Sequence, residues 1–107
     1  MRIRKHDDEL LQEEILLISK VSDALAHPAR VSMFKYIMDM NKEMKPVYNK
    51  DLVEKFGYAQ ATVSQHMSVL ISSGLVEARK DKKFSYFYAN LGILAKYLNA
   101  TKKFSVG

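Results

Sequence analysis

The stretch DLVEKFGYAQATVSQHMSVLISSGLV, residues 51–76, decides the fold of this chain. Its apolar side chains recur at helical spacing on both sides of a short break around Gly57, at Leu52, Val53 and Phe56 and then at Val63, Met67, Leu70 and Ile71. Glycine in the break is a helix stop signal, and Asn49 is the expected N-cap of the first helix. Two helices joined by a short turn that contains glycine are typical of a helix-turn-helix motif, predicted here over residues 49–73.

The period of the sequence changes directly after this motif. Residues 75–79 and 84–88 are strand-like, the second run being rich in aromatic side chains, and the basic segment 80–83 lies between them. We therefore expect a β-hairpin with a basic tip over residues 75–88. A helix-turn-helix followed directly by a hairpin is the winged-helix arrangement.

Three further helices are expected around this centre, over about 8–25, 28–40 and 91–103. The predicted fold class is mainly α with a β-hairpin wing, in the order α-α-α-α-β-β-α. Residues 8–25 carry two adjacent apolar stripes, an arc wider than a surface helix needs. Such an arc fits burial against a second chain or, equally, a central core helix.

Length and composition bound the remaining possibilities. The 107 residues suffice for a single domain, 1–107, and 48% of them are hydrophobic, which excludes wholesale disorder. The absence of cysteine excludes disulfides and thiolate metal sites and fits a cytoplasmic location. No apolar run approaches the roughly 20 residues that span a bilayer, so no membrane partner is expected, and the first residues do not resemble a signal peptide.

The charge is distributed unevenly along the chain. The net charge is +5, and residues 59–107 carry 7 basic and 2 acidic side chains. This asymmetry favours a polyanionic partner on one side of the molecule. No acidic residue occurs from Phe56 to Val76, so nothing on the second helix of the motif would repel phosphate. Together with the helix-turn-helix, this charge predicts duplex DNA as the partner, whereas a solubilising surface is the alternative reading of the charge alone.

The predicted recognition helix presents short polar side chains that can bond to base edges in the major groove. The residues expected to contact bases are Gln60, Thr62, Ser64 and Gln65. Contacts to the phosphate backbone are expected from the wing and from the inner edge of that helix, at His66, Ser68, Arg79, Lys80, Lys82 and Lys83. For His66, packing inside the protein is the alternative to a phosphate contact.

These segments together resemble the ArsR-type bacterial repressors. The resemblance covers about residues 23–90 and is carried by ALAHPARVSMF at 24–34, DLVEKFG at 51–57 and ATVSQHMSVL at 61–70. Met67 stands where the family usually has leucine, a volume-conserving change. The resemblance implies a homodimeric winged-helix repressor whose dimer contacts come from the first and last helices, 8–25 and 91–103. The interface residues expected on this basis are Leu11, Ile15, Ile18, Leu91, Leu94 and Leu98.

The sequence departs from this family in its sensing sites. Family members that respond to metals use cysteine pairs or Asp/His sets on the last helix, and residues 91–103 contain no Asp, Glu or His. No cofactor and no metal site are therefore expected. His6 with Asp7, Asp8 and Glu9 could hold a metal weakly, although a solvated helix start is favoured; His27 reads as a turn residue. An inducer is unknown, and Met33, Met38 and Tyr97 could line an apolar pocket but are favoured as core residues.

Two other functional classes compare poorly with a DNA-binding regulator. The chain has no glycine-rich phosphate loop, no cysteine nucleophile and no Gly-x-Ser-x-Gly turn, so no enzymatic activity is expected. The alternative is a winged-helix protein-interaction module without a DNA role, which would have less need of a basic wing. DNA binding alone does not decide between repression and activation, and the operator and the regulated genes are not encoded in the pattern.

Overall fold

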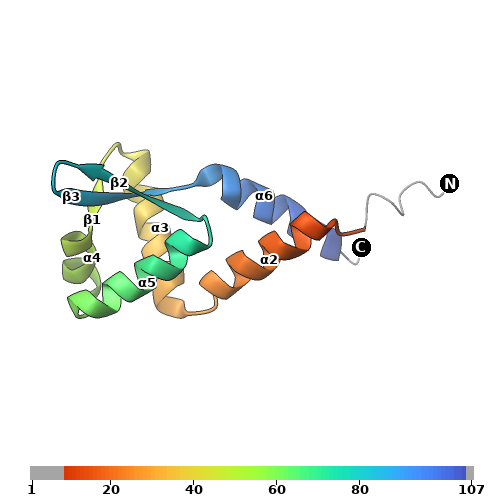
Figure 1. Cartoon of the computed structure of the whole chain (residues 1–107), viewed down its shortest axis with the longest axis horizontal. Coiled ribbons are helices and arrows are strands. Elements are labelled where there is room, and N and C mark those ends of the chain that lie inside the picture. Colours follow the sequence, from red (N-terminus) through yellow and green to blue (C-terminus); the bar gives the residue numbers. More distant parts are fainter. Residues whose placement is uncertain (1–8, 106–107) are drawn as a thin grey trace.

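The computed structural model describes residues 9–105, and Figure 1 shows the course of the chain. The elements follow in the order α2 (Gln12–Ala24), α3 (Pro28–Lys42), β1 (Val47–Tyr48), α4 (Asn49–Phe56), α5 (Gln60–Ser72), β2 (Val76–Asp81), β3 (Phe84–Ala89), α6 (Leu91–Thr101) and the 3-10 turn η1 (Lys102–Phe104). This is the winged-helix fold that the sequence predicts. The order differs from the expected one in two elements: β1 adds a third strand to the sheet, and the 3-10 turn η1 follows α6, which ends at Thr101 and not at residue 103.

The sheet is antiparallel in the order β1-β3-β2. β3 is the central strand, with Val47 opposite Phe87 on one side and Ala78 opposite Phe87 on the other. The strand β1 was not predicted, because two residues following a proline give no readable alternation. The hairpin is also longer than expected: β2 runs on to Asp81, which lies opposite Phe84, so the tip is only Lys82 and Lys83.

Two helix starts differ from the sequence prediction. Helix α2 begins at Gln12 and not near residue 8, because the Glu14 side chain accepts a hydrogen bond from the Leu11 N–H at 2.9 Å and so places the N-cap at Leu11. The N-cap of α4 is Tyr48 and not Asn49; the Asp51 carboxylate accepts from the Tyr48 N–H at 2.8 Å. At the other end of α4, Gly57 has φ 73°, the left-handed conformation expected of it.

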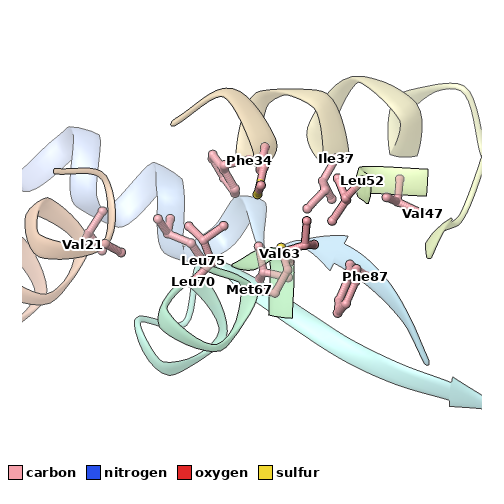
Figure 2. Close-up of a cluster of buried hydrophobic side chains, with 13 residues drawn as sticks. Val21, Phe34, Ile37, Val47, Leu52, Val63, Met67, Leu70, Leu75 and Phe87 are labelled. Carbon is pink, nitrogen blue, oxygen red and sulfur yellow. The ribbon is translucent and has the colours of Figure 1, made fainter. Parts of the chain in front are cut away.

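The core lies where α3, α5 and the sheet meet (Figure 2). Met33 and Ile37 on α3, Leu70 on α5 and Leu75 before β2 are each fully buried. Burying such a side chain contributes about 1.5–3 kcal/mol each, so this cluster fixes α5 against α3. The apolar face of α5 therefore points toward the core, and its polar face points toward solvent.

α2 and α6 lie side by side at the end of the molecule away from the wing (Figure 1). The Lys103 ammonium joins them by donating to the Glu14 carboxylate and the Glu9 carbonyl, both at 2.8 Å. The Leu11 N–H, and next the Lys103 ammonium, hold the pKa of Glu14 below its ordinary value. These contacts order the two helices into one layer.

Candidate nucleic-acid interface

Helix α5 presents a polar, uncharged face to solvent. Val63, Met67 and Leu70 are buried on its inner side. At 100° per residue the opposite side is centred on Ala61, Gln65, Ser68 and Ser72, all exposed. This face carries hydrogen-bond donors and acceptors without formal charge, which suits contact with base edges.

The predicted base-contacting residues divide into two groups. Gln60, Ser64 and Gln65 are exposed, whereas Thr62 is half-buried at the edge of α5. Ser68, predicted to contact the backbone, lies on the same face as Gln65 and is exposed. Whether a residue of α5 is exposed to a DNA groove therefore depends on the side of the helix on which it lies, and not on its distance from the N-terminus of the helix.

The wing carries exposed lysines at its tip. Lys80, Lys82 and Lys83 are all exposed, and the two-residue tip holds Lys82 at φ 61°, a left-handed conformation. Arg79 differs from them. Its guanidinium lies 4.6 Å from the centre of the Tyr88 ring and 3.2 Å from the Glu77 carboxylate. Arg79 therefore stabilises the base of the wing, and its charge is partly neutralised.

One cationic residue near the wing was missed in the sequence. Lys50, in the first turn of α4, lines a cavity of about 550 Å³ together with Lys83 and Phe84 of the wing and Gln60 of α5. Lys50 and Lys83 are far apart in the chain, so only the tertiary structure shows that they share a surface. No local sequence signal marks Lys50 for this role.

Arg30 and two histidines connect α5 to the helices behind it. Arg30 Nε donates to the Ala24 carbonyl at 2.7 Å and Nη2 donates to the Asp23 carbonyl at 3.3 Å. Arg30 Nη1 lies 3.3 Å from His66 Nδ1, and the His66 ring centre is 4.7 Å from that of His27. Arg30 thus joins the C-terminal end of α2, where carbonyls lack helical partners, to the recognition helix.

The hydrogen bonds fix how both imidazoles carry their protons. His27 Nδ1 accepts from the Ala29 N–H at 3.1 Å and caps α3. A guanidinium can only donate, so His66 Nδ1 is also an acceptor. Burial, and next the charges of His27 and Arg30, lower the pKa of His66 from 6.5. Nδ1 is therefore the acceptor in both rings, and in neutral His66 the proton lies on Nε2.

His66 is thus half-buried and packed against His27 and Arg30, the alternative to a phosphate contact that the sequence left open. His27 is more than a turn residue, because its ring caps α3 and contacts α5.

The other predicted metal and inducer residues have different surroundings. His6, Asp7 and Asp8 lie outside the described residues, and residues 9–105 contain no group of three His, Asp or Glu side chains in metal-binding geometry. Met33 is fully buried, Tyr97 Oη lies 3.2 Å from Ser22 Oγ, and Met38 lines a cavity of only about 100 Å³.

The predicted dimer residues lie on α2 and α6 or next to them. Leu11, Ile15, Leu91 and Leu98 are exposed, with 55%, 42%, 52% and 51% of their surface accessible, while Ile18 and Leu94 are half-buried. Leu16 of α2 and Phe104 of η1, which were not predicted, are also large apolar residues with exposed side chains. Within residues 9–105 no helix combines the length and hydropathy that a bilayer crossing demands.

Comparisons with known proteins agree with this geometry. Residues 27–78 match the model of the family described as bacterial regulatory protein, arsR family. The match ends within β2, so it covers α3, α4 and α5 and excludes the two helices expected to form a dimer. No curated protein sequence matches the chain significantly.

Several solved structures share the fold. An ArsR-like transcriptional regulator from Rhodococcus sp. RHA1 superposes with a TM-score of 0.71 at 17% identity, over 82% of this chain and 78% of that one. NolR from Sinorhizobium fredii gives 0.64 at 24% identity, over 97% and 93%. The transcriptional repressor BigR from Xylella fastidiosa gives 0.60 at 23% identity, over 84% and 87%.

The family is described as one of bacterial regulatory proteins, and the Rhodococcus and Xylella proteins are described as a transcriptional regulator and a transcriptional repressor. The family match over residues 27–78 and the shared fold together identify the central region of this cysteine-free chain, α3 to α5, as one of the ArsR type, within a winged-helix fold.

Proposed function

We propose that the protein is a sequence-specific repressor that binds duplex DNA as a homodimer at an inverted repeat in the cytoplasm. The observation that carries this proposal is the neutral polar face of α5, exposed beside the lysines of the wing tip. Base edges select sequence through that face, and phosphates are held by Lys80, Lys82 and Lys83.

The division of labour within this interface follows from charge. Gln60, Ser64 and Gln65 are the proposed base contacts, and Thr62, half-buried, contributes at the edge of the groove. Ser68 extends the face along α5. Arg79 remains a proposed backbone contact, because its side chain is 58% exposed although it pairs with Glu77. His66 instead supports α5 through its contact with Arg30.

A second copy of the chain is the proposed partner of α2 and α6. Leu11, Ile15, Leu91 and Leu98 expose large apolar side chains there, and a 107-residue chain builds only a small core of its own. Two-fold symmetry would place two recognition helices in successive major grooves, about 34 Å apart. The bound dimer would block access of polymerase to the promoter.

The deciding experiment selects binding sites from a random pool of duplex DNA at about 150 mM salt. Enrichment of an inverted repeat with half-sites one helical turn apart is the expected result. Absence of enrichment, from protein shown to be folded and dimeric, would refute sequence-specific binding and favour a protein-interaction module. A reporter gene placed behind the selected site then separates repression, which lowers expression, from activation.

Gln65→Ala tests base recognition within the same assay. Loss of a bidentate base contact costs about 1–3 kcal/mol of discrimination, so affinity for the selected site falls about tenfold or more while affinity for random duplex is unchanged. Gln12→Ala, an exposed glutamine on α2, is the matched control. Equal loss on both kinds of DNA would place Gln65 on the backbone and contradict the assignment.

A further inference from the structure

The cavity between α4 and the wing has the dimensions and chemistry of a small-molecule site. Its volume of about 550 Å³ falls within the range of roughly 300–1,000 Å³ usual for such sites. The walls come from β1, α4, the first residue of α5 and the start of β3. Segments from four elements converge on it, so the shape depends on the docking of the wing against α4.

The inner surface of this cavity is largely aromatic and aliphatic. Tyr48 and Phe84 meet edge to face with ring centres 6.4 Å apart, and Val53 of α4 adds an aliphatic wall. Phe84 has 59% of its surface exposed although it is a large apolar residue. A planar ring placed against Tyr48 and Phe84 would cover surface that is otherwise wet.

The polar groups around the cavity are cationic or neutral. Lys50 and Lys83 supply two ammonium groups, and Asn49 and Gln60 supply two amides. Among residues 9–105, no carboxylate lines the cavity. Asp51, adjacent to Lys50 in the chain, is occupied by its hydrogen bond from the Tyr48 N–H. An anionic group on the ligand would therefore be attracted and not repelled.

We propose that this cavity binds a small aromatic carboxylate, with its ring against Tyr48 and Phe84 and its carboxylate near Lys50 or Lys83, and that such a ligand and duplex DNA exclude one another. The exclusion rests on the proposed function, because Gln60 and Lys83 are among the residues assigned to DNA. Ligand binding itself does not rest on the proposed function. Occupancy of the cavity would connect a metabolic signal to release of the operator without cysteine or metal chemistry.

The first test is made without DNA. The probe is 2-naphthoate, titrated into the folded protein at about 150 mM salt while backbone amide shifts are followed by NMR, with neutral 2-naphthylmethanol as its uncharged counterpart. We expect shifts confined to residues 48–53, 60 and 83–85, and about tenfold weaker binding of the alcohol. Shifts confined to α2 and α6, equal binding of both probes, or no binding would each overturn the proposal.

Variants assign the two parts of the site. Phe84→Ala removes the exposed ring, and Lys50→Gln combined with Lys83→Gln removes both charges; each is expected to weaken 2-naphthoate binding about tenfold. Lys102→Gln, an exposed lysine beyond α6, is the matched control and should bind normally. Unfolding in urea is measured for all variants, and undiminished binding by a folded Phe84→Ala protein would refute the site.

The second test measures exclusion on the selected operator. At ten times its Kd for the wild type, 2-naphthoate should lower the DNA affinity of the wild type about tenfold and that of the Phe84→Ala variant only about twofold. Simultaneous binding of probe and DNA would refute exclusion while leaving the ligand site intact. Failure of the protein to bind any operator would count against the proposed function alone, because the titration without DNA stands separately.

Discussion

Lys82 offers one substitution with two opposite expected effects. The residue lies at the wing tip with an exposed side chain and with φ at 61°. That conformation costs a residue with a Cβ about 1–2 kcal/mol, whereas glycine adopts it freely. The side chain, by contrast, is a proposed phosphate ligand. Lys82→Gly should therefore stabilise the folded protein and weaken its binding to DNA.

The size of each effect can be worked out separately. Glycine also loses about 0.5–1 kcal/mol more chain entropy on folding, so the net gain in the free energy of unfolding is about 0.5–1 kcal/mol. For a domain of this size that corresponds to about 2–8 °C in Tm. Each phosphate contact contributes about 0.9 to the slope of log K against log salt. A dimer that loses one contact per wing should lower that slope by about 1.8.

Two control variants separate the backbone from the charge. Lys82→Ala removes the same charge but keeps a Cβ in the left-handed conformation, so it should weaken DNA binding equally without any gain in stability. Met44→Gly relieves the same conformation, φ 62°, at the end of α3, where the side chain is 89% exposed. The Lys45 N–H donates to the Met40 carbonyl across it, a helix ending that normally uses glycine. Met44→Gly should therefore stabilise the protein and leave DNA binding unchanged.

The assays are urea unfolding and DNA affinity measured across a series of salt concentrations. If Lys82→Gly is no more stable than Lys82→Ala, the strain at the wing tip is refuted. If both variants keep the wild-type salt slope, Lys82 does not contact phosphate and the backbone role of the wing tip is wrong. The two results are independent, because urea unfolding is measured without DNA.

Further predictions concern the residues behind the interface and the dimer face. Arg30→Met should lower the free energy of unfolding by about 2 kcal/mol in urea, because charged hydrogen bonds to the end of α2 are lost; an unchanged value would mean that water replaces them fully. Asn41→Ala should cost about 1–2 kcal/mol by the same measurement, because the Ala89 N–H loses its acceptor at 2.8 Å. Because the folded state lowers the pKa of His66 from 6.5, the unfolded chain binds more protons as pH falls below 6.5, and stability should decrease there. The decrease in the free energy of unfolding should be smaller in His66→Gln than in the wild type. An identical dependence on pH in the two proteins would show that His66 is not its cause. Leu98→Glu should convert a dimer to monomers in sedimentation experiments and lower operator affinity; a Leu98→Glu protein that sediments as a dimer would remove α6 from the proposed interface.

The fold was predictable from the sequence because its signals are local. Apolar residues at helical spacing around Gly57 define α4 and α5, and the change to an aromatic alternating pattern at residues 84–88 defines the wing. The strand β1 escaped prediction because its two residues form only by pairing with β3. The start of α2 escaped because one side-chain bond from Glu14 sets it.

The candidate site was predictable only in part, for the same physical reason. Burial of Val63 and Met67 turns the polar face of α5 outward, and both follow from periodicity along one helix. Arg79 looked equal to the wing lysines until its contacts with Glu77 and Tyr88 were known. A residue's type states what it can bind, whereas its neighbours decide whether that capacity is already used.

The sequence by itself therefore determined the winged-helix fold, the neutral recognition helix and the basic wing, all of which depend on neighbours within a few residues. Only the tertiary structure decided that His27, Arg30 and His66 form one cluster, and that Lys50 and Lys83 share one cavity. His66 lies at least 36 residues from Arg30 and His27, and Lys83 lies 33 residues from Lys50. Their meeting depends on how the elements pack around the core, and packing is a property of the whole chain that no local pattern records.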